Sequence, residues 1–192
     1  MLTLLRPTLV MLGLFTVLTG VIYPLAIMGL TQVALPSKAN GSLITRGGAV
    51  VGSSLVGQLF ASDTYFHGRR SAAGEKGYDA SASSGSNLGP LSKKLQERVD
   101  GDLSALRQTG ALTIPADAVT TSASGLDPHI SPAFAALQVA RVAGARGVSE
   151  ERVRQLLQRH IELPFLGIFG EPRINVLSLN LALDAALPPR AG

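Results

Sequence analysis

The hydrophobic positions of this chain follow two different patterns, and the first is an unbroken apolar run near its start. No charged side chain occurs between residues 7 and 37, and the most apolar part spans about residues 9–30. An apolar helix of about 20 residues crosses a bilayer, whereas the apolar region of a cleaved signal peptide has only about 7–15 residues. The pattern therefore predicts a retained transmembrane helix, with residues 1–38 forming a short stub and this span.

Small residues and a proline mark this predicted helix. Gly13, Thr16 and Gly20 recur along it at a spacing that lets a second helix approach closely. Pro24 lacks the N–H that would pair with the Gly20 carbonyl, so a local distortion is expected there. We therefore predict a contact with a partner helix at Gly13, Thr16, Gly20 and Pro24. The alternative is that small residues are simply common in membrane helices.

Residues 39–192 alternate between short apolar runs and longer helical periods. Apolar runs near glycines predict short strands at 43–45, 49–52 and 54–56, and a further run predicts one at 119–121. Apolar residues three or four apart predict helices that open at Pro90, at Ser131, at Ser149 and in the run from Ile174. The predicted fold class is therefore α+β, with one transmembrane helix followed by a single mixed α/β domain over residues 39–192.

Composition and missing motifs remove several classes of function. The 192 residues include no Cys, which excludes disulfides, thiolate zinc sites and cysteine nucleophiles. The 17 Lys and Arg and 13 Asp and Glu give a net charge of +4 without a block of like charges, so nucleic acid is not an expected partner. The sequence also lacks a phosphate-binding loop, an HExxH zinc motif, a GxSxG elbow and the DKTGT motif of P-type pumps. No catalytic or metal site is therefore predicted.

Four polar clusters remain, and each has a structural and a functional interpretation. Residues 65–69 form either an aromatic strand end or part of a site, and residues 84–90 form either a capped loop or a backbone cradle for an anion. Residues 120–132 are rich in hydroxyls. They form either part of a functional site or a network of turns whose side chains bond to the local backbone. In residues 170–177, Glu171 stands beside Arg173, a pattern that most often gives a local ion pair. The residues alone leave these alternatives open.

These clusters and their order carry a resemblance that covers almost the whole chain. The matching runs are VVGSSLVGQ at 50–58, YFHGR at 65–69, SGSNLGP at 84–90, TTSASGLDPHISP at 120–132, RVAGARG at 141–147 and GEPRINVLSLNLALD at 170–184. With the single span before them, the sequence resembles the small C subunit of the Kdp potassium-transporting ATPase.

The resemblance implies a non-catalytic accessory subunit of an ATP-driven, high-affinity potassium import complex in the cell inner membrane. The expected partners are a channel-like potassium-conducting subunit and a P-type ATPase subunit, which the C subunit assembles or stabilises. The family is described as a catalytic chaperone that raises the ATP affinity of the pump subunit, with a cytoplasmic N-terminus and a periplasmic domain. Because ATP is cytoplasmic, bilayer geometry favours a domain that caps the mouth of the channel-like subunit over one that touches ATP. ATP is thus expected as a ligand of the complex, and no cofactor of the chain itself is expected.

The resemblance also implies site residues. A family loop contributes to nucleotide binding, and its counterpart here is Ser84, Gly85, Ser86, Asn87 and Gly89. The polar residues of the family motifs are His67, Arg69, Asp127, His129, Glu171, Arg173 and Asn175. Two other functions stay open from the residues alone. One is a membrane-anchored extracytoplasmic enzyme that uses Asp127 and His129, and the other is a small-anion binding module at residues 84–89.

Overall fold

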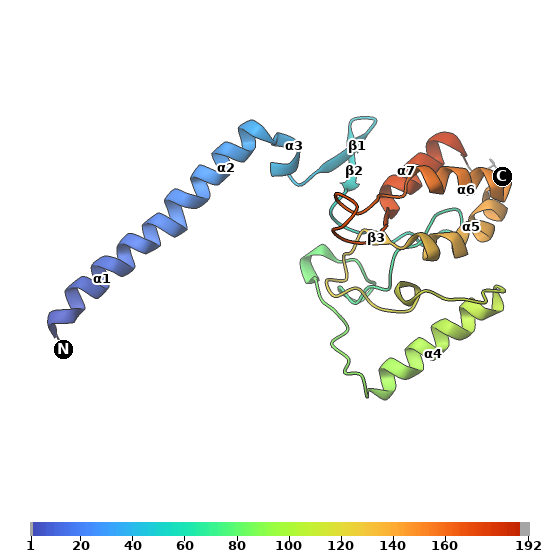
Figure 1. Ribbon diagram of the computed structural model, residues 1–192, viewed down its shortest axis with the longest axis horizontal. Helices are drawn as coiled ribbons and strands as arrows, with labels where there is room; N and C mark the ends of the chain where they lie inside the picture. Colours follow the sequence, from blue (N-terminus) through green and yellow to red (C-terminus); the bar gives the residue numbers. More distant parts are fainter. Residues whose placement is uncertain (1, 189–192) are drawn as a thin grey trace. The chain divides into compact units, whose positions relative to one another are not determined.

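The structure, a computed structural model, describes residues 2–188 and combines helices with short strands, which confirms the predicted α+β fold class (Figure 1). The chain divides into two compact units, and the division falls between Val51 and Gly52. The first unit contains the apolar helix, and the second contains all four polar clusters. The domain boundary inferred at residues 38 and 39 stays a prediction.

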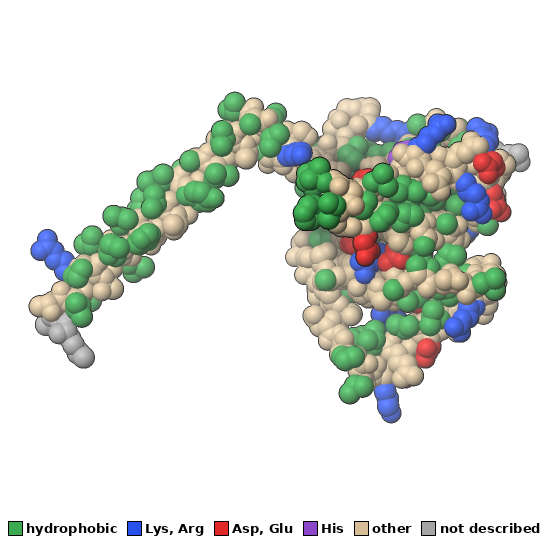
Figure 2. Space-filling view, viewed as in Figure 1, with side chains coloured by type: hydrophobic (Ala, Val, Ile, Leu, Met, Phe, Trp, Pro, Cys, Tyr) green, Lys and Arg blue, Asp and Glu red, His purple; other side chains and the backbone are tan. Residues whose placement is uncertain are grey.

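One long apolar helix dominates the first unit. Helix α1 (Leu2–Val17), a π-helical turn (Leu18–Ile22) and helix α2 (Tyr23–Ala34) follow one another without a break. Residues 3–34 are long and apolar enough to cross a membrane, and their most apolar stretch is not buried against the rest of the chain. Figure 2 shows hydrophobic side chains along the whole length of this helix. Such a surface is unfavourable in water and favourable in lipid.

The helix widens into the π turn immediately before Pro24. The Tyr23 N–H bonds to the carbonyl of Leu18, five residues back, instead of to a carbonyl four residues back. Proline has no N–H to donate, and a wider turn is one way in which a helix absorbs the missing bond. The distortion expected at Pro24 is therefore present, and it occupies residues 18–22.

A short helix and a hairpin follow the span. After helix α3 (Pro36–Ala39), strands β1 (Leu43–Arg46) and β2 (Ala49–Ser53) pair through a turn of Gly47 and Gly48. Both glycines have positive φ, +59° and +82°, as a type I′ turn requires. The strands predicted at 43–45 and 49–52 are confirmed. The strand predicted at 54–56 is wrong, because the Leu55 N–H bonds to the Ser53 hydroxyl and turns the chain there.

Three helices build the core of the second unit (Figure 1). They are α5 (Pro132–Arg146), α6 (Glu150–Arg159) and α7 (Val176–Ala186), and α6 contacts both of the others. Their fully buried side chains include Val139, Val142, Val153, Leu179 and Leu183. Ser131, where the sequence predicts that this helix opens, caps α5 by accepting the Phe134 N–H at 3.0 Å, and Gly147 ends the helix with a φ of +64°.

Three other boundaries differ from those predicted. Helix α4 (Lys93–Gln108) starts after a turn at residues 90–91, so Leu91 lies outside the helix and is 97% exposed. The strand predicted at 119–121 is wrong. These residues follow a 3-10 turn (Ala116–Ala118), and of the three only Thr121 makes a β-bridge. The last apolar run begins as strand β4 (Ile174–Asn175), since the Asn175 side chain caps α7 by accepting the Ser178 N–H at 3.0 Å.

Residues 64–67 run between the helices without a neighbouring strand, and side-chain amides take the place of one. Asn180 of α7 accepts the Phe66 N–H at 2.9 Å and donates to the Phe66 carbonyl at 2.9 Å. Gln138 of α5 does the same for His67, at 2.7 and 3.1 Å. Because buried backbone groups need partners, these two amides fix the path of the segment.

Two arginines of α5 complete this support. Arg146 is fully buried and donates to the Thr64 carbonyl at 2.6 Å, and its guanidinium pairs with Asp184 of α7 at 3.0 Å. Arg141 donates to the Tyr65 carbonyl at 3.1 Å. The YFHGR run is therefore held by side chains that lie more than seventy residues away in sequence, in α5 and α7.

We expect Asn180→Leu to destabilise the protein strongly. Leucine has a similar volume but bonds to neither backbone group of Phe66, and each buried group left without a partner costs about 1–3 kcal/mol. The control is Gln155→Leu, which makes the same change at an exposed amide of α6 and should cost no more than about 0.5 kcal/mol. Chemical unfolding of the full chain in detergent measures both, and equal costs would contradict the role of Asn180.

Candidate functional site

Two of the polar clusters lie side by side through backbone pairing. Strand β3 (His129–Ile130) pairs antiparallel with β4, with His129 opposite Asn175 and Ile130 opposite Ile174. The ladder continues where the Val176 N–H donates to the Pro128 carbonyl at 2.9 Å. The clusters at residues 120–132 and 170–177 lie far apart in the sequence, and this pairing brings them together in one site.

A chain of charged groups crosses this ladder. The Arg69 guanidinium lies 3.0 Å from the Asp127 carboxylate, which also accepts the backbone N–H of His129 at 3.0 Å. The His129 ring lies between two carboxylates, with Nδ1 3.6 Å from Asp127 and Nε2 3.9 Å from Glu162. Glu162 in turn accepts from Arg173 at 3.0 Å. Each of the two arginines thus faces a carboxylate, and the His129 ring lies between these two carboxylates.

This network lines a cavity of about 650 Å³, which we call the polar cleft. The motif residues that line the polar cleft are Arg69, Asp127, His129, Glu171 and Arg173. Asp117 and Ser131 line it too, and Asp117 accepts both the N–H and the hydroxyl of Ser131, at 2.7 and 2.9 Å. Five of the seven predicted polar residues therefore gather around one cavity.

The network controls the ionisation of Asp127. Burial alone would raise the pKa of this carboxyl, but hydrogen bonds from His129 and Arg69 and the charge of Arg69 outweigh burial and lower the pKa to about 2. Tyr78 lies against the same pair and donates its hydroxyl to the Arg69 carbonyl at 2.6 Å. Burial and the nearby Asp127 charge raise the pKa of Tyr78 to about 12. Asp127 is thus a stable carboxylate and Tyr78 a stable phenol at neutral pH.

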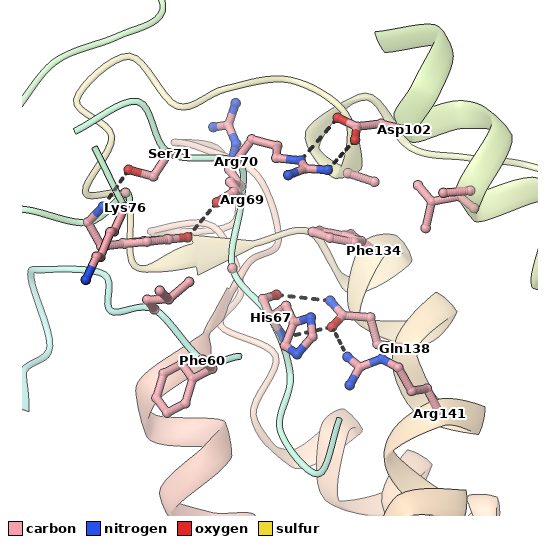
Figure 3. A pocket seen from close by; sticks show the side chains of 17 residues that line it. Phe60, His67, Arg69, Arg70, Ser71, Lys76, Asp102, Phe134, Gln138 and Arg141 are labelled. Carbon is pink, nitrogen blue, oxygen red and sulfur yellow. Dashed lines mark hydrogen bonds and ion pairs between the residues drawn. The ribbon is translucent and has the colours of Figure 1, made fainter. Parts of the chain in front are cut away.

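His67, the sixth predicted residue, lines a second cavity of about 410 Å³ (Figure 3). Gln138 bonds to its backbone and also accepts from Arg141 at 2.8 Å. Burial lowers the pKa of His67 and outweighs the hydrogen bond to the Ser62 carbonyl, which raises it. The charge of Arg141 lowers this pKa further, so the neutral ring is favoured at pH 7. Arg70 pairs with Asp102 of α4 on the other side of this cavity. Asn175, the seventh residue, lines neither cavity and donates to the Ser54 carbonyl at 2.8 Å.

The loop predicted to bind nucleotide lies against the 120–132 cluster. The Ser84 N–H donates to the Ser124 carbonyl at 3.0 Å, and a Cβ at Gly85 would approach the Ala123 carbonyl to 2.9 Å. Gly125 faces the loop with a φ of +70°, where a Cβ would lie 2.7 Å from the Ser84 carbonyl. Two backbone segments therefore meet without space for side chains. Neither cavity is lined by Ser84, Gly85, Ser86, Asn87 or Gly89, and their nucleotide-binding role stays a prediction.

Sequence reasoning missed three groups of this site. Glu162 and Asp117 lie outside the recognised runs, and they reach the site only through the fold. Tyr78 lies in a stretch rich in Gly, Ser and Ala, and no motif or hydrophobic period in that stretch indicates a site. The expectation of a local ion pair between Glu171 and Arg173 is wrong, because the antiparallel bridge between Glu162 and Arg173 brings the more distant carboxylate to the guanidinium.

The two hydroxyls that line the polar cleft, those of Thr120 and Ser131, are engaged in structural hydrogen bonds. Thr120 donates to the Ala116 carbonyl at 2.8 Å and accepts from Arg69 at 3.2 Å, and Ser131 donates to Asp117. His129 faces carboxylates rather than a hydroxyl. A nucleophile needs a base within hydrogen-bond reach, so this geometry favours a structural or binding role for the polar cleft.

The small residues of the span face open space. An added Cβ at Gly13 or at Gly20 would meet no atom of the chain within 4 Å. Thr16 is exposed, and the π turn that ends next to Pro24 contains Gly20. The four residues are therefore accessible to a partner, and the partner contact stays a prediction.

Comparison with known proteins identifies a single family. Residues 5–185 match the family model KdpC, described as "K+-transporting ATPase, c chain". A "Potassium-transporting ATPase KdpC subunit" of Caulobacter vibrioides (strain NA1000 / CB15N) is 60% identical over 193 residues, covering 100% of this chain and 98% of the relative. Proteins of the same name are 54% identical in Polaromonas naphthalenivorans (98% and 97% covered) and in Nitratidesulfovibrio vulgaris (100% and 98%).

The low pKa of Asp127 predicts a pH-dependent contribution to stability. A carboxyl with a folded-state pKa of about 2, below its ordinary value of 3.8, stabilises the fold fully above pH 4. This contribution is lost as the pH falls from about 4 to about 2. Asp127→Asn should therefore be less stable than the unaltered chain at pH 6, and the difference should shrink toward pH 2. Urea unfolding of the full chain in detergent measures this profile.

The control for this experiment is Asp100→Asn, which alters an exposed carboxylate of α4. Its stability should follow that of the unaltered chain across the same pH range. A difference for Asp127→Asn that stays constant from pH 6 to pH 2 would contradict the assigned interactions.

Proposed function

The chain belongs to the KdpC family of K⁺-transporting ATPase c chains, and we propose that it is a non-catalytic, single-pass subunit that assembles the transport complex. Its partners would be the channel-like and the P-type ATPase subunits. The observation that carries this proposal is the 60% identity to a potassium-transporting ATPase subunit over the whole chain. The exposed apolar helix, residues 3–34, adds a physical route to membrane partners.

The span supports a role in assembly. Between helices in lipid, close packing replaces the hydrophobic effect as the main attraction, and small residues permit it. Gly13, Thr16 and Gly20 leave room on a helix that makes no close contact of its own at the two glycines. Pro24 has no N–H to donate, and the π turn before it changes the backbone path in the same part of the span.

The polar cleft supports a role without chemistry of its own. Asp127 is paired with Arg69 and Glu162 with Arg173, and Asp127, with a pKa of about 2, is a weak proton acceptor. Such a network holds β3, β4 and the segment around Arg69 in one rigid arrangement. A rigid polar surface is suited to bind a partner in fixed register.

The proposed topology follows from the family resemblance. It has the N-terminus in the cytoplasm and the second unit on the periplasmic side of the inner membrane. Cytoplasmic ATP would then lie across the bilayer from the second unit. An effect of this subunit on ATP affinity would be transmitted through the other subunits, as a coupling free energy of about 1–3 kcal/mol.

Gly20→Leu is expected to reduce co-purification of the two larger subunits with the tagged full chain. Leucine adds bulk where the partner helix is proposed to approach, while the chain itself offers no atom within 4 Å to clash with it. Gly29→Leu is the matched control, because Gly29 is also free of contacts and lies nine residues further, on another side of the helix. Equal recovery of the complex with both variants would contradict the proposed helix contact.

The proposed topology predicts which side of the membrane labels an introduced cysteine. The chain has no Cys, and Leu112 is completely exposed in the second unit, so Leu112→Cys provides a single reactive thiol. A membrane-impermeant maleimide should label this thiol in spheroplasts without lysis. Labelling only after lysis would place the second unit in the cytoplasm and would restore direct contact with ATP as a mechanism.

A further inference from the structure

Five large hydrophobic side chains are exposed together in a small hairpin of the second unit, between α6 and β4. We call residues 163–169 the apolar tip. Its large side chains are each 66–78% exposed, and they are Leu163, Phe165, Leu166, Ile168 and Phe169. Figure 2 shows hydrophobic side chains gathered over this loop. No charged residue occurs between Glu162 and Glu171. Exposed apolar patches of this kind mark an interaction surface.

Four backbone N–H groups of the apolar tip bond to carbonyls within it. Phe165 and Phe169 exchange two N–H···O bonds of 3.0 Å, and the Gly167 N–H donates to the Pro164 carbonyl at 2.9 Å. The Ile168 N–H donates to the Phe165 carbonyl at 3.2 Å. Backbone groups that enter an apolar medium need hydrogen-bond partners, and four N–H groups of this hairpin find theirs within the hairpin.

The distribution of the side chains favours lipid over a protein groove. A hairpin that docks in a groove buries one face and keeps polar groups on the other. Here Phe165, Leu166, Ile168 and Phe169 are all exposed, although neighbouring residues of a hairpin point to opposite sides. A hairpin with apolar side chains on both faces is suited to an environment that contacts both faces at once, as the bilayer interface does.

The chain itself keeps the apolar tip near a bilayer. The apolar helix ends at Ala34 and the second unit begins at Gly52, and a fully extended connection of that length reaches only about 60 Å. Because the apolar helix already attaches the chain to the bilayer, a second contact forms at a high effective concentration, and a small apolar patch is enough to make it.

We propose that the apolar tip inserts into the lipid interface beside the span and gives the second unit a second membrane contact. The tip's aromatic and aliphatic side chains would occupy the boundary between headgroups and acyl chains, as interfacial anchors do. Glu162 and Glu171, the nearest charged residues on either side of the apolar tip, would stay in the aqueous phase. The proposal rests on the span lying in a membrane and does not depend on partner subunits.

The test uses a single cysteine, because the chain has none of its own. Ile168→Cys is labelled with an environment-sensitive fluorophore in the full chain, reconstituted into phosphatidylethanolamine and phosphatidylglycerol vesicles. The label should shift its emission to the blue and lose most of its intensity when lipids with nitroxide-labelled acyl chains are included. Leu112→Cys, another exposed site of the second unit, is the control and should show neither change.

A second variant tests the cause of the insertion. Adding Phe165→Ser and Phe169→Ser to the Ile168→Cys chain should return the label to a water-like emission, with unchanged circular dichroism. Labels at residues 168 and 112 that respond equally to the nitroxide lipids would overturn the proposal. A label at residue 168 that escapes the nitroxide lipids and is shielded only when the larger subunits are co-reconstituted would also overturn it, and would assign the tip to a protein partner. Failure of assembly with Gly20→Leu leaves these outcomes unaffected, so the two proposals are tested separately.

Discussion

The second unit depends on how residues 64–67 satisfy their buried backbone without a neighbouring strand. Asn180 bonds to both backbone groups of Phe66, and Gln138 bonds to both backbone groups of His67. Arg146 and Arg141 donate to the carbonyls of Thr64 and Tyr65 in the same segment. Because unpaired buried backbone groups are costly, α5 and α7 can keep their positions only with this segment between them. The same six bonds set the course of the chain into Arg69, and so place its guanidinium at the polar cleft.

A second constraint comes from the apolar helix. Its exposed hydrophobic surface is incompatible with water and fits the thickness of a bilayer, which accords with membership of a family of membrane-transport subunits. The first unit thus presents an apolar surface suited to lipid, and the second carries a network of hydrogen-bonded and paired polar groups.

The sequence predicted the features that depend on local pattern. The span, the Ser131 cap and the helices α5 to α7 follow from periodicity and from capping residues, while the boundaries at Pro90 and Ile174 were misplaced because a turn and the Asn175 cap delay each helix. The polar clusters could be found, but their grouping could not. The pairing of β3 with β4, and the arrival of Glu162 and Asp117, depend on contacts between distant residues that no spacing encodes.

The central claim is that this chain performs no reaction alone and is nevertheless required by the complex that it joins. The most direct measurement is the K⁺-stimulated ATPase activity of that complex, purified from membranes with and without this chain and matched for the two larger subunits. The account predicts that the activity is lost without the chain and returns when the full-length chain is co-expressed. Full K⁺-stimulated activity in its absence would contradict the account.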